Sequence, residues 1–460
     1  MTLADVAAAV GGELADAPDS SLLVRGAAAD SRSVAAGDLF VAIPGERVDG
    51  HDYVEAARQA GAVAILAQRP VGAPAVVVAD PVAALGRLAH HLLTQLPDID
   101  VVALTGSSGK TSTKDLLGGV LRRRGPVVAP EGSFNTEVGL PLTVLRCDRD
   151  TRTLVLEMGA RGKGHVAYLC GIAPPRVGIV LNVGSAHVGE FGSREAIAVA
   201  KGELPASLPA EGTAVLNADD PLVAAMPSPA QRLTFGAGPG ADVRVENLEL
   251  DERIRASFDL VHGDQRARVQ LRVAGEHNAL NAAAVAAAAL AVGMDFPDVA
   301  DALQYAEVVS RWRMEVSDTP GGVTIINDAY NANPESVTAA LKSLAEMGRR
   351  HRDATTWAVL GEMRELGPDS AAEHDRIGRM AVRLHIHRLV AVGEGARAMH
   401  LGAAHEGSWD GESAWVADTA AAVDLLRGGV RPGDVVLVKA SRAVGLERVA
   451  DALAADGGDG

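Results

Sequence analysis

The sequence predicts an α/β protein with three domains, and chain length, composition and the order of apolar runs all support this fold class. A chain of 460 residues is too long for one hydrophobic core, and about 150 residues per domain suggests three cores. Apolar residues make up 48% of the chain but aromatic residues only 3%. This composition favours closely packed layers of strands and helices over a disordered chain.

The first predicted domain, residues 1–97, is a small N-terminal α/β module. An apolar run at 39–43 predicts a strand, and the residues at 53–60 and 82–96 have the spacing of helices. The dipeptide Pro97-Asp98 ends the last of these helices and is the predicted linker to the next domain.

The second predicted domain, residues 98–310, contains apolar runs that alternate with helical segments. The predicted strands are residues 100–104, 153–157 and 177–182. Buried strands that alternate with helices predict a parallel sheet. A helix that begins near Asn278 closes the segment, and its alanine-rich part from Ala282 to Met294 is shorter than the about 20 residues needed to span a bilayer. We interpret it as a buried helix.

The third predicted domain, residues 311–460, repeats this design as a Rossmann-like domain. The predicted strands are residues 323–327, 355–360, 389–392 and 435–439. Each apolar run is followed by polar or glycine-containing residues, which is typical of strands in an open parallel sheet.

The charge and the cysteine content exclude several classes of protein. The net charge is −16, and the sequence has no long lysine or arginine run that could follow a nucleic-acid backbone. Cys147 and Cys170 form no metal-binding cluster and are few for a disulfide framework, so a reducing cytoplasm is expected. The first residues, Met1 to Asp5, lack the basic stretch of a secretion signal.

A glycine-rich loop between a predicted strand and a predicted helix points to phosphate binding. The loop consists of Thr105, Gly106, Ser107, Ser108, Gly109, Lys110, Thr111 and Ser112. Its backbone N–H groups and the start of the helix can hold a polyphosphate, while Lys110 contacts the β- and γ-phosphates and Thr111 supplies a hydroxyl to Mg²⁺. Leu104 stands where the general pattern has glycine, which implies a shortened variant. A loop that only caps a helix is disfavoured by the Gly-Lys-Thr spacing, so the second domain is expected to resemble a P-loop ATPase.

Polar residues just after the other central strands are candidate metal ligands. Glu157 ends one strand and His187 follows the next. A carboxylate beside a triphosphate can hold Mg²⁺, but Glu157 is equally well read as an exposed loop acid. A histidine is more often structural and is a poor magnesium ligand. Lys201 follows the predicted helix cap Ser193 and reads, on its own, as a solvated helix lysine.

Taken together, these residues resemble the Mur ligase family over nearly the whole chain. In the first segment the matching motifs are 30–34, 37–45 and 49–53. In the second they are 105–113, 134–136, 156–160, 182–187, 200–203 and 277–281. In the third they are 311–315, 327–334, 361–367 and 438–447.

The resemblance implies a nucleotide and metal site built from two domains. It implies Glu157, His187 and Lys201 as magnesium ligands, with Lys201 carbamylated so that a cation becomes a carboxylate-like ligand. The implied nucleotide contacts are Asn281 near adenine, Arg313 at the phosphates and Asp328 at the ribose. Arg311 remains the alternative to Arg313, and helix capping by Asn278 is the alternative reading of the 277–281 motif. Lys110, Lys201, His187 and Arg313 are the implied catalytic residues.

The resemblance also implies two organic substrates. Ser31, Arg32 and His51 are expected at the UDP end of an acceptor, although turn chemistry alone also explains such loop residues. Further implied substrate contacts are Asn135, Thr136 and Asn333. Lys439 and Arg442 are candidates for the remote carboxylate of a dipeptide; surface charges or an inter-domain ion pair are the alternatives.

The activity that the resemblance implies is an ATP-driven, magnesium-dependent amide ligation in peptidoglycan precursor synthesis. The implied partners are a UDP-N-acetylmuramoyl tripeptide and D-alanyl-D-alanine, used by a monomer whose domains close about residues 310–314. Other branches are disfavoured because the chain lacks an opening Gly-x-Gly-x-x-Gly turn and an Asp-Asn-Pro-Arg motif, and because Thr111 follows the loop lysine. A nucleotide switch that acts on a protein partner is an alternative class. A UDP-sugar-binding scaffold without catalysis is a third class, which the intact Lys110-Thr111 pair disfavours.

Overall fold

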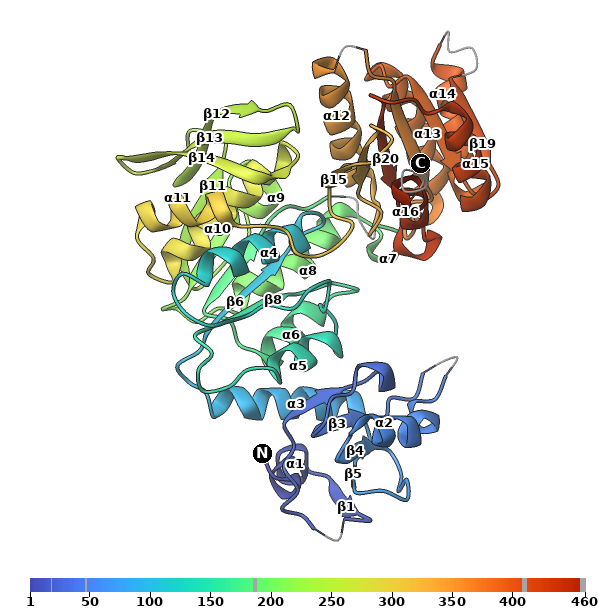
Figure 1. Ribbon diagram of the computed structural model, residues 1–460. Helices are drawn as coiled ribbons and strands as arrows, with labels where there is room; N and C mark the ends of the chain where they lie inside the picture. The colour runs from blue at the N-terminus through green and yellow to red at the C-terminus, as the bar shows by residue number, and fades with distance from the viewer. Residues whose placement is uncertain (18, 46–47, 185–187, 352, 408–411, 456–460) are drawn as a thin grey trace.

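The computed structural model describes residues 1–17, 19–45, 48–184, 188–351, 353–407 and 412–455. Their strands form three separate sheets, and Figure 1 shows three bodies that follow one another from blue through green and yellow to red. The sheets take their strands from residues 13–77, 100–274 and 315–439, so each predicted segment contains one whole sheet. The predicted three-domain α/β fold class is confirmed.

The first sheet has five strands in the order β1-β5-β4-β3-β2, and only β1 runs antiparallel to its neighbour. The strands are β1 (Glu13–Ala15), β2 (Gly26–Ala28), β3 (Asp38–Val41), β4 (Ala64–Ala67) and β5 (Ala75–Val77). The helices are α1 (Leu3–Val10), α2 (Val54–Ala60) and α3 (Pro81–Thr94). Asp80 caps α3 by accepting from two backbone N–H groups, and proline fits the first helical position that follows.

The second sheet is the largest, with nine strands in the order β14-β13-β12-β11-β10-β9-β6-β8-β7. The strands that run parallel are β6 (Asp100–Thr105), β7 (Val127–Val128), β8 (Thr153–Glu157), β9 (Val177–Val180), β10 (Thr213–Asn217), β11 (Gln231–Gly236) and β12 (Val243–Leu250). The strands β6, β8 and β9 are the three predicted from apolar runs. Since they are parallel neighbours, their carboxyl ends meet at one edge of the sheet.

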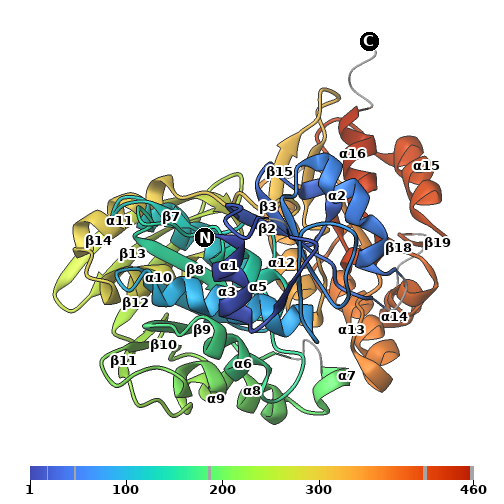
Figure 2. The ribbon, with the colours of Figure 1, turned by 90° about the horizontal axis from the view of Figure 1, so that it is seen from below.

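The helices of the second domain are α4 (Lys110–Leu121), α5 (Gly139–Val144), α6 (His165–Ile172), α7 (Val188–Phe191), α8 (Arg194–Ala206), α9 (Pro221–Ala224), α10 (His277–Ala291) and α11 (Phe296–Tyr305). Figure 1 shows α3 beneath this domain, where it packs against α5 and α6. In the view from below, the first domain lies in front of the other two, and the third domain lies beside the second (Figure 2).

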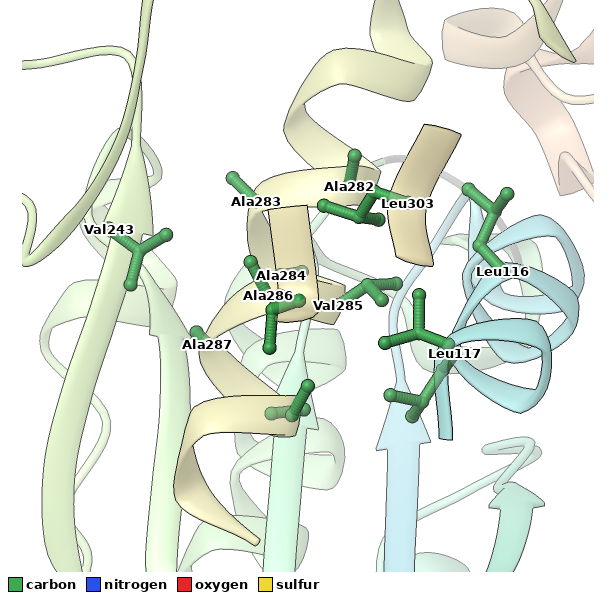
Figure 3. Packing of buried hydrophobic residues seen from close by; sticks show 14 of the residues in the cluster. Leu116, Leu117, Val243, Ala282, Ala283, Ala284, Val285, Ala286, Ala287 and Leu303 are labelled. Carbon is green, nitrogen blue, oxygen red and sulfur yellow. The ribbon is translucent and has the colours of Figure 1, made fainter. Parts of the chain in front are cut away.

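The alanine-rich helix α10 is the centre of the second domain's core, as predicted for a buried helix. Its residues 282–289 are all fully buried. Figure 3 shows residues 282–287 between Leu116 and Leu117 of α4, Leu303 of α11 and Val243 of β12. Small side chains allow these elements to approach the helix closely from several sides. Among the described residues, no helix has the length and apolar character needed to cross a membrane.

An antiparallel extension of the central sheet was not predicted from the sequence. It consists of β12, β13 (Arg255–His262) and β14 (Gln265–Ala274), which pair as two successive antiparallel neighbours. In β14, Val269 and Leu271 are buried, whereas Gln270 between them and Arg268 and Arg272 on either side are exposed. That alternation is the signal of a half-buried strand, and a search for unbroken apolar runs passes over it.

The third sheet has six strands in the order β15-β16-β20-β17-β18-β19 and is parallel except for β15. The strands are β15 (Glu315–Asp318), β16 (Thr324–Asn327), β17 (Thr356–Gly361), β18 (Arg388–Val392), β19 (Ser413–Val416) and β20 (Val435–Lys439). The helices are α12 (Pro334–Arg350), α13 (Ser370–Arg383), α14 (Arg397–Glu406), α15 (Thr419–Gly429) and α16 (Glu447–Ala455). The four strands predicted here are therefore present, each within about one residue of its expected bounds.

Candidate active site

The carboxyl ends of strands from the second and third sheets face each other across a cavity of about 290 Å³. Its lining includes Glu157 at the end of β8, Asn217 at the end of β10, Asp328 just after β16 and Lys439 at the end of β20. Ligands of open α/β sheets bind at this edge of the sheet. The cavity is therefore the candidate active site, and two domains contribute to it.

The glycine-rich loop connects β6 to α4, and its residues from Ser107 to Ser112 line the cavity. Gly109 has φ of +80°, and a Cβ atom there would lie 2.8 Å from the side-chain oxygen of Asn281, so glycine is required on both grounds. The helix begins at the next residue, Lys110, whose ammonium donates to the carbonyl of Gly106 at 2.8 Å. Burial lowers the pKa of Lys110, against the opposing effect of the Glu157 charge.

The first half of the loop is fixed by hydrogen bonds to residues that follow β8 and β9. Thr105 is fully buried, and its hydroxyl donates to the carbonyl of Met158 at 2.8 Å. The N–H groups of Ser107 and Ser108 donate to the side-chain oxygen of Asn182 at 3.0 and 2.9 Å. The cavity lining begins at Ser107 and includes neither Thr105 nor Gly106. The expectation that Thr105 contacts a nucleotide is thereby corrected, because its only polar side-chain atom ties β6 to β8.

Glu157 is buried and strongly hydrogen bonded, so the exposed-acid reading of this residue is wrong. Only 2% of the residue is exposed. Its carboxylate accepts from the hydroxyl of Thr111 at 2.9 Å, from Ser133 at 2.8 Å and from the amide of Asn135 at 2.7 Å. Burial alone would raise the pKa of Glu157, but the charges of Lys110 and Arg313 and the hydrogen bonds from Ser133 and Asn135 hold it below its usual value. The carboxylate is therefore kept ionised.

Lys201 is also buried, which contradicts the reading of a solvated helix lysine. It lies in α8, whose predicted cap Ser193 accepts from the N–H of Ala196, and only 3% of the lysine is exposed. Burial lowers its pKa well below the usual value, and the nearby charge of Lys110 lowers it further, while Glu157 opposes the change. The side chain is thus disposed to be an uncharged amine.

Arg313, rather than Arg311, reaches the cavity from the third domain. Its guanidinium donates to the Thr111 hydroxyl at 2.9 Å and lies 4.0 Å over the ring of Tyr330. The buried Nε atom of Arg313 has no hydrogen-bond partner among the described residues. Arg311 is exposed and stacks on Trp312 instead. The Arg313 guanidinium is held in place by the Tyr330 ring and keeps its Nε–H donor available, which suits the binding of a phosphate oxygen.

Asp328 and Lys439 form a buried ion pair inside the third domain. The ammonium of Lys439 donates to Asp328 Oδ2 at 2.6 Å and to the carbonyl of Asn331 at 2.9 Å. Burial lowers the pKa of Lys439, and the charge of Asp328 opposes this. Both alternatives considered for Lys439 are therefore wrong: it is neither a surface charge nor part of an inter-domain pair. Because its donors are occupied, it does not offer a cation to a substrate carboxylate in this conformation.

Two asparagines, Asn281 and Asn333, lie beside the loop. Asn281 donates to the side chain of Asn278, which in turn donates to the carbonyl of Ala274, so Asn278 does not cap the start of α10. Asn333 caps α12 by accepting from Ser336, and its amide approaches the carbonyl of Ser107 at 3.4 Å. The loop is thus contacted by both the second and the third domain.

The predicted substrate residues lie in several places. Asn135 faces the cavity, but its amide is engaged with Glu157, and the hydroxyl of Thr136 accepts from the N–H of Gly139 at 3.3 Å without lining the cavity. Arg442 is half exposed, pairs with Glu447 at 2.7 Å and lies 4.3 Å from the ring of Trp312. His187 lies outside the described residues.

The first-domain residues are not part of the cavity. Arg32, 89% exposed in its side chain, donates to both oxygens of Asp30, and this pairing lowers the pKa of Asp30 to about 2. Ser31 begins the short 3₁₀ helix that Asp30 caps. His51 is buried: its Nδ1 lies 2.6 Å from Asp49, and its Nε2 accepts from the N–H of Gln68. The expectation that the His51 ring contacts an acceptor is corrected, because both ring nitrogens hold the loop together.

Ser133 and Tyr330 were not selected from the sequence, although each contacts a predicted site residue. Tyr330 lies in the recognised 327–334 motif, so its position beside the site was open to prediction. Nothing local distinguishes Ser133, because only the fold brings it to Glu157.

Family models match three parts of the chain. They are the Mur ligase middle domain over residues 104–289, the glutamate ligase domain of Mur ligases over 312–442, and the Mur ligase family catalytic domain over 24–91. Together they match most of each of the three domains.

Individual relatives match over almost their whole length. A protein of Mycobacterium bovis named UDP-N-acetylmuramoyl-tripeptide--D-alanyl-D-alanine ligase is 49% identical, over 99% of this chain and 98% of its own. A Bacillus subtilis protein of the same name is 33% identical over 97% of both. Among solved structures, MurF of Acinetobacter baumannii has a TM-score of 0.88 at 32% identity, covering 99% of this chain and 98% of that one.

MurF ligase of Thermotoga maritima, solved in complex with ADP, has a TM-score of 0.80 at 33% identity, over 95% of this chain and 98% of that one. Full-length matches of this kind extend across all three domains and both sides of the cavity. The chain therefore belongs to the Mur ligase family.

Proposed function

We propose that this chain is an ATP-dependent ligase that joins D-alanyl-D-alanine to a UDP-N-acetylmuramoyl tripeptide in peptidoglycan precursor synthesis. The observation that carries the chemistry is the meeting of three groups at Thr111: the phosphate loop, the buried carboxylate of Glu157 and the guanidinium of Arg313. The choice of substrates is supported by the shared name of the relatives that match the chain nearly end to end.

The reaction proceeds in two steps. A carboxylate oxygen of the acceptor attacks the γ-phosphorus of ATP, the bond to the bridging oxygen breaks, and ADP leaves. The amine nitrogen then attacks the acyl carbon, the bond to the phosphate oxygen breaks, inorganic phosphate leaves, and the nitrogen loses a proton. Lys110 and Arg313 neutralise the charge that develops on the transferred phosphoryl group. Because two domains contribute these groups, their closure aligns the reactants.

The residues present suit a magnesium ion. Thr111 and Glu157 offer two oxygen atoms beside the phosphate loop, and the depressed pKa of Glu157 keeps its carboxylate ionised. Mg²⁺ is commonly held by one or two protein oxygens together with phosphate oxygens and waters, so the absence of a three-residue acidic or histidine cluster among the described residues is compatible with it. When bound, the ion would neutralise charge on the phosphate oxygens.

Lys201 is proposed to carry a carbamate. Its uncharged amine can add to carbon dioxide, forming an N–C bond and releasing one proton, and the product is an anion. This anion would place a negative charge beside the Lys110 ammonium, so that the two groups attract each other. A carbamate oxygen is also a hard ligand of the kind that magnesium prefers.

Replacing Glu157 by glutamine should raise the magnesium concentration needed for half-maximal activity by at least about 10-fold, since even outer contacts of a metal site commonly change affinity by that factor. The substitution keeps the size of the side chain and removes its charge. Magnesium titrations of ADP formation provide the measurement. Glu195→Gln, in the exposed first turn of α8, is the matched control. An unchanged magnesium requirement would remove Glu157 from the metal site.

The choice of amine is tested by competition between D-alanyl-D-alanine and single amino acids in the presence of the tripeptide acceptor. We expect the dipeptide to be used preferentially, and ADP formation to require both acceptor and amine. Product masses identify the amide formed. Preferential use of one amino acid with a shorter acceptor would move the protein to another branch of the family. ATP hydrolysis without either substrate would instead favour a nucleotide switch.

We also place the reaction in the cytoplasm and expect a monomer. Both cysteines are free and buried, which fits a reducing compartment. The cavity is formed by the second and third domains of one chain, so the site as described uses no group from a second copy. Sedimentation analysis that finds a stable dimer would contradict the expected state.

A further inference from the structure

A buried ion pair lies directly behind the phosphate loop, outside the cavity. Lys114 and Asp115 follow one another in α4, their side chains are 0% and 1% exposed, and Nζ lies 2.9 Å from Oδ1. Removing two charges from water is costly, and apolar residues of similar size often replace such pairs without loss of stability. Stability alone is therefore a weak explanation for this pair, and its other contacts suggest what it does.

Lys114 holds residues 130–132, which precede the side chains that contact Glu157, the proposed magnesium ligand. Its ammonium donates to the carbonyl of Pro130 and, at 2.8 Å, to that of Gly132. The next residue, Ser133, and Asn135 both donate to Glu157. Through these contacts Lys114 of α4 fixes the position of Ser133 and Asn135, and these two residues orient Glu157.

Asp115 holds the junction to the third domain. Its Oδ2 accepts from the backbone N–H of Ser310 at 2.8 Å, and the Ser310 hydroxyl accepts from the N–H of Gly132 at 2.9 Å. The contacts close a ring that runs from Lys114 through Gly132 and Ser310 to Asp115. Three residues beyond Ser310, Arg313 returns to Thr111 in the first turn of the same helix.

The backbone on both sides of Arg313 has an unusual conformation. Trp312 and Met314, on either side of it, have φ of +60° and +52°, values that cost energy for residues other than glycine. Such a conformation persists only where its surroundings hold it. Asp115 fixes the start of this segment through Ser310, and Asp328 accepts from the N–H of Met314 at 3.2 Å at its end.

We propose that Lys114 and Asp115 are positioning residues for phosphoryl transfer. Lys114 fixes the position of Glu157 relative to the phosphate loop, and Asp115 fixes that of Arg313. This inference rests on the proposed function, because it assigns the two residues to the step that forms the acyl phosphate. Neither touches a reactant. Their effect is on the alignment of groups that do, where small displacements have large consequences for rate.

The test is a double-mutant cycle between Asp115→Asn and Arg313→Lys, with kcat and the KM for ATP as readouts. We expect Asp115→Asn alone to lower kcat by roughly 10- to 100-fold, as for a misaligned reacting group, with KM changed much less. In the Arg313→Lys background the same change should cost far less, because Arg313 is the group through which Asp115 acts. Lys114→Met and Glu157→Gln form the corresponding cycle on the other side.

Asp100→Asn is the matched control, because Asp100 is another largely buried aspartate in an ion pair of the same domain, with Arg124, and lies at the opposite end of β6 from the loop. Its kcat should stay near that of the unmodified protein. Equal losses from Asp115→Asn in both Arg313 backgrounds, or loss of thermal stability with normal kcat, would overturn the proposal.

If Asp115→Asn does not fold, Ser310→Ala decides the matter, since it removes only the hydroxyl that accepts from Gly132 and should show the same coupling to Arg313 in weaker form. Additive losses in Ser310→Ala and Arg313→Lys would again contradict the proposed ring of contacts.

The unmodified protein is assayed first: if it forms no ADP in response to acceptor and amine, the proposed function fails. Magnesium-dependent ADP binding by calorimetry then tests the Lys114 side alone, where Lys114→Met should weaken the magnesium effect and Asp100→Asn should not.

Discussion

Lys110→Ala is expected to lower kcat by roughly 100-fold or more while leaving the fold intact, as for other electrostatic contacts to a transition state. The lysine lines the cavity at the start of α4, and within the protein its ammonium donates a hydrogen bond to the Gly106 carbonyl. Loss of one such bond costs only about 1 kcal/mol of unfolding free energy. The loss in rate arises instead because the charge developing on the phosphoryl group loses one of the two cations, Lys110 and Arg313, that neutralise it in the proposed mechanism. Steady-state ADP formation, with thermal melting beside it, provides the measurement.

Lys342→Ala is a suitable control for this experiment, because Lys342 is exposed on α12. Its turnover should match that of the unmodified protein. A well-folded Lys110→Ala protein with near-normal turnover would remove the phosphate-binding role from the loop lysine, and with it the main argument for the proposed chemistry.

Lys201→Ala is expected to be nearly inactive, with partial recovery on addition of short carboxylates that enter the vacated space. The physical reason is that the proposed carbamate would supply a negative ligand at a position where the unmodified chain has an uncharged amine beside Lys110. Activity at several concentrations of acetate or formate measures the recovery. The Lys342→Ala protein should show no such dependence on carboxylate.

The carbamate itself can be detected independently of activity by carbon-13 resonance after exposure of the protein to labelled carbon dioxide. Carbamylation requires the uncharged amine, and the depressed pKa of Lys201 extends that form toward neutral pH. As the pH falls the amine becomes protonated, so the carbamate signal should decline and dependence on added carbon dioxide should increase. An active protein with an unmodified Lys201 would refute this assignment.

Much of the site was predictable because its signals are local. The loop at 105–112 is recognisable from glycine spacing alone, and the strands that end at Glu157 and Lys439 are recognisable as apolar runs. The helix cap at Ser193 and the buried helix α10 follow from the same kind of local pattern. Local sequence sets these features because turn conformation, capping and periodicity depend on residues within a few positions of one another.

The environments of individual side chains were not predictable in this way. Glu157 and Lys201 looked like ordinary exposed residues until burial was known. Lys439 and His51 were expected to meet ligands, but the fold supplies each with partners of its own. The extension formed by β13 and β14 also went unpredicted, because alternation in a half-buried strand is a weaker local signal than an unbroken apolar run.

By itself, the sequence determined the α/β class, the three-domain order, the phosphate loop and the family. Only the tertiary structure decided which charges are buried, which of Arg311 and Arg313 reaches the loop, and that Lys114 and Asp115 link Glu157 to Arg313 through Ser310. The physical reason is distance along the chain. Asp115 and Ser310 become neighbours only when the second domain has folded, and the pKa of a buried group depends on those distant neighbours rather than on adjacent residues.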